Sequence, residues 1–331
     1  MAPTNLQLQL QTLIAEGLNE LDIPKEPASL YEPYRYSLDI GGKRIRPLLT
    51  LLACGLCNGK IKDALPAALA VEILHNFTLV HDDIMDSADT RRGKASVFKK
   101  WDQNIAILSG DVMFADAFTH LEYYGLKSDF SKSEYLNVHQ TFTQATVTVC
   151  EGQALDMDFV EREQVSHQEY LKMIQGKTAA LLAGALKLGA IAAHATSTQQ
   201  EALFNFGMEM GVAFQIQDDL LDATADPEKF GKKVGGDIFE GKKTYLTILA
   251  LERANESDSS FIQQVLDSTQ PSQTDVDKVL DIMHSLNVID DIAEEVNQHY
   301  NSALHELDDF NDSEYKHELK NLLIFLQNRD H

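Results

Sequence analysis

The segment LPAALAVEILHNFTLVHDDIMD, residues 65–86, joins a long apolar pattern to a terminal cluster of acidic residues. Apolar side chains recur at three- and four-residue spacing up to residue 80, which predicts a helix that is apolar around most of its circumference. The end of the segment carries Asp82, Asp83 and Asp86 in the spacing DDxxD. We therefore expect a central helix, wrapped by others, that presents carboxylates at its C-terminal end.

A second DDxxD ends another apolar pattern, in FQIQDDLLD at residues 214–222, where it comprises Asp218, Asp219 and Asp222. In each motif the first and last aspartates share a helix face. Negative charge at a helix C-terminus is unfavourable without a cation, and hard carboxylate oxygens suit Mg²⁺. One such motif is read equally well as a solvated helix end. Two copies favour a metal site.

The helical period dominates the rest of the chain, and no sustained alternating run predicts a strand. Glycine, proline and charge mark breaks at residues 24–33, 41–42, 87–93 and 227–241. No linker divides the chain, so we predict one all-α domain of ten or more helices over residues 1–331. The helical patterns cover residues 6–21, 65–80, 105–124, 135–159, 178–193, 201–221, 245–253, 276–286 and 292–307.

The charge balance limits the ligands that this protein binds. With 28 lysines and arginines against 51 aspartates and glutamates, the formal net charge is −23. Nonspecific nucleic-acid binding is therefore not expected, because a polyanion would be repelled. An anionic substrate would need a local group of basic residues, bound metal cations, or both.

The cysteines and the apolar segments predict a cytoplasmic protein. Three cysteines, Cys54, Cys57 and Cys150, are an odd, low count that fits a reducing compartment. The lone CxxC lacks further zinc ligands, so we interpret Cys54 and Cys57 as buried structural thiols. The N-terminus does not resemble a signal peptide. The most apolar stretch, residues 178–194, is interrupted by Lys187 and is short for a membrane span.

Basic residues lie near both acidic motifs in the sequence. GGKRIRP at residues 41–47 places three cations after a glycine turn, and Arg91 and Arg92 follow the first DDxxD. Two lysine pairs, at 232–233 and 242–243, follow the second. Any one pair alone is read as ordinary surface charge. Their position beside both motifs, in a chain short of cations, favours phosphate binding.

These motifs together resemble the trans-prenyl diphosphate synthases, the polyprenyl synthetase family. The resemblance covers well over half of the chain and implies a single large helical bundle of the isoprenoid synthase type with a central apolar cavity. The matching segments, in order, are GGKRIRP at 41, LVHDDIMDSADTRRG at 79, LSGD at 108, EGQ at 151, GKTA at 176, FQIQDDLLD at 214 and GKKT at 241.

The resemblance assigns roles to individual residues. It implies three Mg²⁺ ions that hold an allylic diphosphate, and a separate site for isopentenyl diphosphate. The implied metal ligands are Asp82, Asp83, Asp86, Asp218, Asp219 and Asp222. The isopentenyl diphosphate site would comprise Lys43, Arg46, His75 and Arg92, whereas Arg91 would contact the allylic diphosphate. Gly42 is a further implied substrate-binding residue.

Further residues would serve the reacting centre. The resemblance implies that Lys177, Thr178 and Gln215 line it, and that Lys232 and Lys242 assist the leaving diphosphate. In FGKKVGGD, residues 230–237, either Lys232 or Lys233 can fill the first lysine role, and we prefer Lys232. The chain reads Tyr-Leu-Thr at 245–247, where a leucine–proline pair is common in the family.

The implied reaction is a magnesium-dependent condensation of isopentenyl diphosphate with an allylic diphosphate. An aromatic residue at Phe77, with Thr78 beside it, would form a floor that limits chain growth, although Phe77 is also read as ordinary core. The absence of a two-residue insertion in the first motif favours geranylgeranyl over farnesyl diphosphate as the product. The family also implies a homodimer.

Two other functions compete with chain elongation. A class I terpene cyclase carries Asn or Asp, then Ser or Thr, then Glu at four-residue intervals in its second metal motif. Here Asp218 is followed at that spacing by Asp222 and Asp226, which favours elongation. A noncatalytic partner subunit would be expected to have degraded metal motifs, and both motifs are intact.

Overall fold

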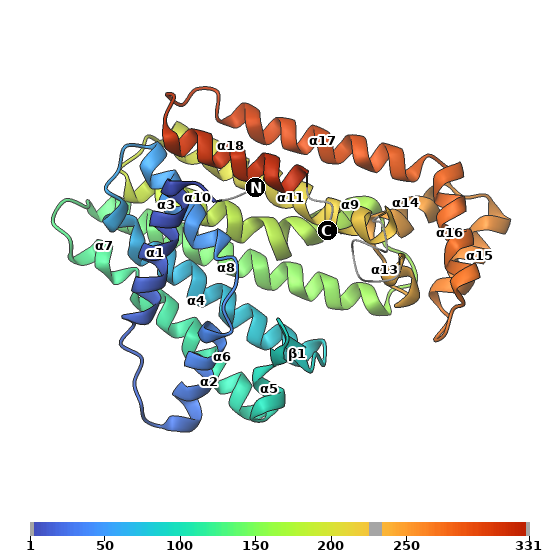
Figure 1. Ribbon diagram of the computed structural model, residues 1–331, viewed down its shortest axis with the longest axis horizontal. Coiled ribbons are helices and arrows are strands. Elements are labelled where there is room, and N and C mark those ends of the chain that lie inside the picture. The colour runs from blue at the N-terminus through green and yellow to red at the C-terminus, as the bar shows by residue number, and fades with distance from the viewer. Residues whose placement is uncertain (1–2, 225–233, 329–331) are drawn as a thin grey trace. The chain divides into compact units, whose positions relative to one another are not determined.

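The computed structural model describes residues 3–224 and 234–328, which are almost entirely helical (Figure 1). The strands of the described part are β1 (Thr90–Arg91) and β2 (Lys94–Ala95), which pair antiparallel. The helices up to residue 161 are α1 (Asn5–Asn19), α2 (Ala28–Asp39), α3 (Ile45–Leu56), α4 (Ile61–Met85), α5 (Val97–Lys100), α6 (Gln103–Thr119), α7 (Glu122–Leu126) and α8 (Lys132–Glu161).

The later helices follow the same all-helical pattern. A five-residue π-helix, η1 (Gln175–Ala179), lies between α9 and α10. The remaining helices are α9 (His167–Ile174), α10 (Ala180–Ala192), α11 (Ser197–Thr224), α13 (Gly236–Phe239), α14 (Tyr245–Arg253), α15 (Glu256–Leu266), α16 (Gln273–Ser285), α17 (Val288–Glu306) and α18 (Glu314–Gln327).

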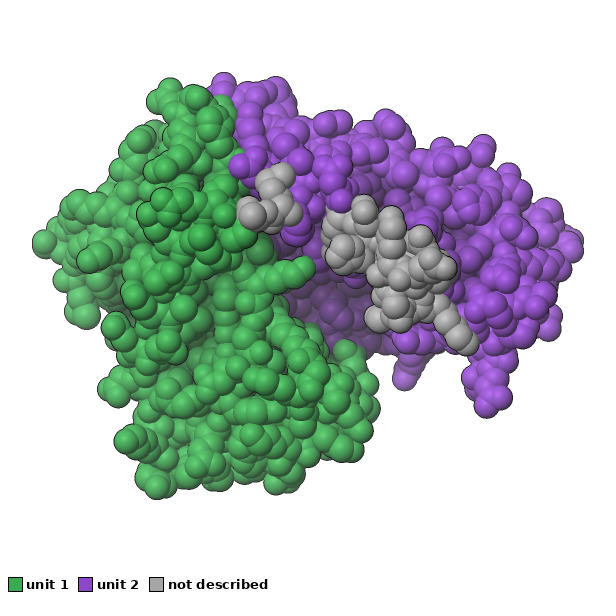
Figure 2. All heavy atoms as spheres, viewed as in Figure 1, with its two compact units in different colours: residues 1–146, 184–204, 310–319 green, residues 147–183, 205–309, 320–331 purple. Residues whose placement is uncertain are grey.

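The chain divides into two compact units, which Figure 2 colours separately. Unit 1 comprises residues 1–146, 184–204 and 310–319, and unit 2 comprises residues 147–183, 205–309 and 320–331. Both units are discontinuous in sequence, so they are not successive domains. The prediction of one domain over residues 1–331 stays a prediction.

Helix α4 is the core helix of unit 1, as its sequence predicts. It packs against α3 and α6 (Figure 1), and Ala67, Ala70, Val71 and Ile73 are all fully buried. Small side chains on α4 permit close helix packing, and burial around the helix explains why its apolar residues do not form a single stripe. Its C-terminus therefore has a rigid position within the unit.

By length and composition, α4 also passes a test for a membrane-spanning helix. However, 61% of the apolar window lies buried inside the protein, as expected for the core helix of a soluble protein. The presence of this helix is therefore only weak evidence for a membrane span.

The structure corrects the break predicted over residues 24–33. Helix α2 begins at Ala28 and contains Pro33. Proline inside a helix removes one main-chain hydrogen bond, but Tyr34 and Leu38 on the same helix are 1% and 6% exposed. Burial of this face stabilises a helix that the proline spacing alone argues against. The break predicted at residues 87–93 contains β1 and the turn of a short hairpin.

The cysteines are free thiols. Cys54 is buried, Cys57 is half-buried and Cys150 is exposed. Burial raises the pKa of the Cys54 and Cys57 thiols to about 12, so both are protonated near neutral pH. That environment agrees with their interpretation as structural thiols.

Candidate active site

The first DDxxD motif lies at the C-terminal end of α4, in unit 1. Asp82 belongs to the last turn and is half-buried, whereas Asp86 is the C-cap residue and is exposed. Asp83, between them, is only 3% exposed. The outer carboxylates are therefore more accessible than the middle one.

A tight hairpin after α4 directs two arginines. Arg92 and Gly93, at the turn between β1 and β2, both have positive φ angles, 52° and 76°, as a type I′ turn requires. Arg91 donates from Nε at 2.9 Å and from Nη2 at 2.6 Å to Asp83 Oδ1. This ion pair connects the hairpin to the acidic end of α4.

Arg92 lies on the backbone of the loop that precedes α3. A β-carbon built on Gly42 would lie 2.4 Å from Arg92 Nη1 and 2.7 Å from its Cζ. Only glycine leaves room for the guanidinium there, and Gly42 also has a φ of 145°, which side chains disfavour. The structure thus brings together Gly42 and Arg92, both of which the resemblance implies are substrate-binding residues.

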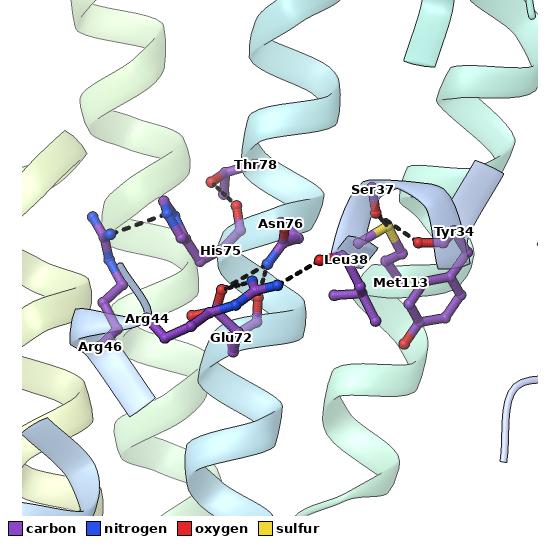
Figure 3. Close-up of polar contacts among 10 residues, drawn as sticks. All are labelled: Tyr34, Ser37, Leu38, Arg44, Arg46, Glu72, His75, Asn76, Thr78 and Met113. Atoms are coloured by element: carbon purple, nitrogen blue, oxygen red, sulfur yellow. Dashed lines mark hydrogen bonds and ion pairs between the residues drawn. The ribbon is translucent and has the colours of Figure 1, made fainter. Parts of the chain in front are cut away.

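Arg46 and His75 complete this cationic site, which we call the basic cradle (Gly42, Lys43, Arg46, His75 and Arg92). Arg46 Nη1 lies 3.1 Å from His75 Nε2 (Figure 3). Because arginine can only donate, His75 Nε2 accepts and the ring carries its proton on Nδ1. Burial, and then the charge of Arg46, lowers the pKa of His75 well below its usual value. The imidazole is therefore neutral.

The guanidinium of Arg46 lacks one hydrogen-bond partner. Its Nε is buried and unsatisfied within the described part of the chain. Burial and the nearby Arg92 lower the pKa of Arg46 to about 10, so the group stays charged at neutral pH. A buried donor without a partner is costly, and an anion bound in the cradle would satisfy it.

Lys43 is the most accessible cation of the cradle. It is exposed and forms no hydrogen bond or ion pair with the residues that the structure describes. With Arg35, Gly42 and Arg44 it lines a cavity of about 450 Å³ within unit 1. Its charge is available to a ligand.

The second DDxxD motif lies near the end of α11, in unit 2. Asp218 is exposed, Asp219 is 7% exposed and Asp222 is half-buried. Asp222 Oδ2 accepts a hydrogen bond of 2.9 Å from the main-chain N–H of Asp237, at the start of α13. The motif is therefore connected to the segment that carries the downstream lysines.

Neutral donors surround Asp219. Its Oδ2 accepts from Tyr170 Oη at 2.5 Å and from the main-chain N–H of Tyr245 at 3.2 Å, and Gln215 Nε2 lies 3.5 Å from Oδ1. Burial raises the pKa of Asp219 to about 7, although these hydrogen bonds favour its charged form. The nearby charge of Asp237 also raises it.

The π-helix η1 positions Lys177 and Thr178 in unit 2. Thr178 Oγ1 donates to Gln215 Oε1 at 3.1 Å, and Lys177 Nζ pairs with Asp156 at 2.5 Å. A β-carbon on Gly152 would lie 2.1 Å from Lys177 N, so the glycine of the EGQ segment permits α8 to approach η1. Single-turn π-helices are frequent at functional sites.

Asp156, which pairs with Lys177, is a candidate site residue that the sequence did not predict. It lies three residues after the EGQ segment, but its spacing from Lys177 gives no signal of the ion pair. The prediction for Lys177 did not name the carboxylate beside it.

The downstream lysines differ in their environments. Lys242 Nζ pairs with Glu240 at 2.6 Å and with Asp237 at 3.2 Å. Lys243 instead donates to the carbonyl of Phe159 at 2.9 Å, near the end of α8. The predicted roles of Lys232 and Lys233 lie outside the described residues.

The residues predicted to limit product length lie one turn before the first motif. Phe77 contacts His81 and Phe114 edge-on, with ring centroids 4.7 and 5.3 Å apart. Phe114 in turn contacts Phe118 at 5.4 Å. Thr78 donates its hydroxyl to the carbonyl of His75. Aromatic neighbours thus hold Phe77 in place.

The donor chemistry of both motifs fits a magnesium ion. No cluster of three or more His, Cys, Asp or Glu side chains is arranged as a metal site within residues 3–224 and 234–328. Mg²⁺, however, keeps several waters and is usually held by one or two carboxylates and substrate phosphates. The accessible Asp82, Asp86 and Asp218 provide such carboxylates.

An all-helical protein with paired aspartate motifs, a cationic cradle and a polar π-helix has the features of an isoprenoid synthase. A family model described as polyprenyl synthetase matches residues 27–283. The chain belongs to the polyprenyl synthetase family and is a prenyltransferase. The resemblance and the all-α fold class predicted from the sequence are confirmed.

Individual relatives agree with this assignment. The chain is 42% identical to the geranylgeranyl diphosphate synthase of Methanosarcina mazei over 242 residues, 73% of this chain and 74% of that protein. It also resembles the crystal structure of geranylgeranyl pyrophosphate synthetase from Pyrococcus horikoshii, with a TM-score of 0.90, 36% identity, and coverage of 97% and 96%.

A further solved relative contains ligands. The chain resembles the geranylgeranyl pyrophosphate synthase of Corynebacterium glutamicum complexed with isoprenyl diphosphate and magnesium, with a TM-score of 0.82 and 28% identity. The similarity covers 99% of this chain and 100% of that one.

Proposed function

We propose that this protein condenses isopentenyl diphosphate with an allylic diphosphate and makes geranylgeranyl diphosphate. The observation that carries the proposal is the basic cradle beside the first DDxxD motif. In a chain of net charge −23, a half-buried arginine whose buried Nε is unsatisfied, a neutral histidine and accessible cations form a local anion site. A diphosphate supplies acceptors for such donors.

The cradle is proposed to hold isopentenyl diphosphate. Arg46 and Arg92 would donate to the diphosphate oxygens, and Lys43 would add a mobile point charge. His75 would accept from Arg46 and fix its orientation without adding charge. Gly42 contributes by leaving space for Arg92.

The allylic diphosphate is assigned to the aspartate motifs. Their six carboxylates and Arg91 would hold it with three Mg²⁺ ions, and Lys242 and Lys232 would assist its departure. When bound, Mg²⁺ supplies positive charge that stabilises the departing diphosphate. Asp83 Oδ1 already accepts hydrogen bonds from Arg91, so Asp83 would coordinate through Oδ2.

The π-helix side chains are proposed to face the reacting carbons. Thr178 and Gln215 would present oxygens toward developing positive charge without acting as nucleophiles, and Lys177 would line the same reacting centre. Ionisation of the allylic substrate is followed by attack of the isopentenyl double bond and loss of a proton to the released diphosphate. This sequence needs no side-chain base.

Assays of the purified chain test the reaction class. We expect consumption of a labelled allylic diphosphate only when isopentenyl diphosphate and Mg²⁺ are both present, and none with EDTA. Consumption of the allylic substrate alone would indicate a cyclase instead. No turnover by the isolated chain, recovered on adding a second synthase, would indicate a noncatalytic subunit.

Phe77 is proposed to limit product length. Its contacts with His81 and Phe114 hold an aromatic ring one turn before the first motif. Phe77→Ala should lengthen the product beyond twenty carbons, as mass spectrometry of the product chains would show. Phe130→Ala, which removes a ring packed on Tyr124 in the same unit, is the matched control. An unchanged product length in Phe77→Ala would refute the proposal that Phe77 limits chain growth.

We also infer a cytoplasmic homodimer. Leu108 on α6 is 53% exposed, and together with Leu30, Ile105, Val112 and Ala115 it lines an apolar groove between α2 and α6. A second copy of the chain would bury this surface. Light scattering should give twice the chain mass, and Leu108→Asp should shift it toward the monomer. A monomeric wild-type protein would contradict the assignment.

A further inference from the structure

Arg44 is oriented differently from the other cations of its loop. It precedes α3 with a φ of 49°, a left-handed conformation that is uncommon for non-glycine residues. Its side chain pairs with Glu72 of α4, and its Nη2 donates to the carbonyl of Leu38 at 2.5 Å. Figure 3 shows Arg44 reaching Glu72 and Leu38, whereas Arg46 reaches His75. Arg44 therefore contacts the scaffold beneath the cradle.

Glu72 is a buried charge in the middle of an apolar helix. Its side chain is 3% exposed, and Arg44 is 15% exposed. Besides Arg44, Asn76 Nδ2 donates to the same oxygen, Oε1, at 2.9 Å. A buried carboxylate needs a charged partner and hydrogen bonds to remain ionised at acceptable cost. In this structure Arg44 is the partner that meets this requirement.

The carboxylate of Glu72 also affects the substrate-binding arginines. Its charge favours the charged forms of Arg46 and Arg92, against burial and against repulsion from neighbouring arginines. Arg44, Arg46 and Arg92 carry three positive charges, and Glu72 carries one negative charge. Two positive charges therefore remain without a counter-charge, even before Lys43 is included. If Arg44 were absent, Arg46 and Arg92 would be the arginines left to pair with Glu72, whose charge already acts on both of them. Glu72 lies three residues before His75, the partner of Arg46.

We propose that Arg44 is a positioning residue that occupies Glu72 and so keeps Arg46 and Arg92 available to the diphosphate of isopentenyl diphosphate. This inference rests on the proposed function of the cradle. If the ion pair only stabilised the fold, its loss would affect the KM values of both substrates alike. A residue that screens a competing carboxylate instead affects the affinity for one substrate only. Its loss can be compensated by removing that carboxylate.

The test compares single and double variants by steady-state kinetics. Arg44→Met should raise the KM for isopentenyl diphosphate roughly tenfold or more, with kcat and the KM for the allylic substrate changed by less than about threefold. Adding Glu72→Gln should return the KM to within about threefold of wild type. A double variant with a KM as high as, or higher than, that of Arg44→Met would overturn the proposal.

Glu72→Gln alone provides a second test if Arg44→Met does not fold. Removing the carboxylate leaves the cradle more positive, so the KM for isopentenyl diphosphate should be no higher than in wild type. A roughly tenfold rise in this KM would show that the ion pair has only a structural role.

Arg44→Lys keeps the positive charge, so its KM for isopentenyl diphosphate should stay close to the wild-type value. A KM equal to that of Arg44→Met would count against the screening role.

A matched ion pair on the same helix serves as the control. Asp63 of α4 is 8% exposed and pairs with Lys127. Lys127→Met should lower the melting temperature without changing the KM for isopentenyl diphosphate. A wild-type protein that shows no turnover dependent on isopentenyl diphosphate would refute the proposed function itself. An active wild type with an unaltered Arg44→Met variant would refute only this inference.

Discussion

The middle aspartates of the two DDxxD motifs have the same position in the sequence but different partners. Asp83 and Asp219 are 3% and 7% exposed. Asp83 accepts two hydrogen bonds from the charged guanidinium of Arg91. Asp219 accepts from a tyrosine hydroxyl and a main-chain N–H, and burial raises its pKa to about 7. One buried carboxylate thus has a counter-ion and the other has neutral donors.

This difference shows that the motif determines spacing but not electrostatics. In both motifs the middle aspartate is buried within the unit to which it belongs, and at least one outer aspartate remains accessible. We expect the outer carboxylates to contribute most to metal binding. The middle ones, besides their proposed metal contacts, should differ in how they support their surroundings. Substitutions at equivalent positions therefore test the comparison directly.

The largest effect is expected at the outer aspartates. Asp82→Asn and Asp218→Asn should each reduce kcat by about a thousandfold, because several kcal/mol of charge stabilisation are lost with a metal ligand. Asp218 is exposed, so its variant should keep the wild-type melting temperature. Asp277→Asn, on an exposed part of α16, is the control. Near-normal kcat in either variant would remove that aspartate from the metal site.

An intermediate effect is expected from Asp83→Asn. It leaves Arg91 without its charged partner and should lower the free energy of unfolding by about 1–3 kcal/mol, as chemical denaturation would measure. The KM for the allylic diphosphate should rise because Arg91 is no longer held in place. Arg91→Lys keeps the charge but loses the two-pronged donation. If both variants matched wild type, Asp83 would not position Arg91.

The smallest effect on stability is expected at Asp219, and it depends on pH. Its folded pKa of about 7 lies above the ordinary value of 3.8, so between these values the folded protein binds a proton that the unfolded chain does not. The free energy of unfolding therefore falls as pH rises, by about 1 kcal/mol from pH 6 to pH 7. Asp219→Asn should abolish this component in EDTA. An unchanged pH dependence would contradict the raised pKa.

Much of the fold follows from local patterns in the sequence. The 3.6-residue period of apolar residues predicted α4 and α11, because a helix buried in the core needs apolar side chains along its length. The sequence also shows that each of these helices has aspartates near its end. Helix α2 was missed because three prolines in residues 24–33 argue for a turn, whereas tertiary burial of Tyr34 and Leu38 decides the outcome. Propensity is a weak prior where packing is strong.

The candidate site was predictable in its residue types but not in its partners. Glycine and arginine spacing indicated a phosphate site, and the structure groups Gly42, Arg46, His75 and Arg92. The ion pairs of Glu72 with Arg44 and of Asp156 with Lys177 join residues 28 and 21 positions apart. No local spacing encodes such pairs. A lone glutamate inside an apolar helix was the available signal for the first, since buried charges require a partner.

The proposed condensation and its twenty-carbon limit can both be tested by counting the units added from isotopically labelled isopentenyl diphosphate. The purified protein, with Mg²⁺, would be given allylic diphosphates of five, ten or fifteen carbons, and the products measured by mass spectrometry. We expect three, two and one labelled units respectively, with every product ending at twenty carbons. Products without label, or the same number of added units from every primer, would contradict this expectation.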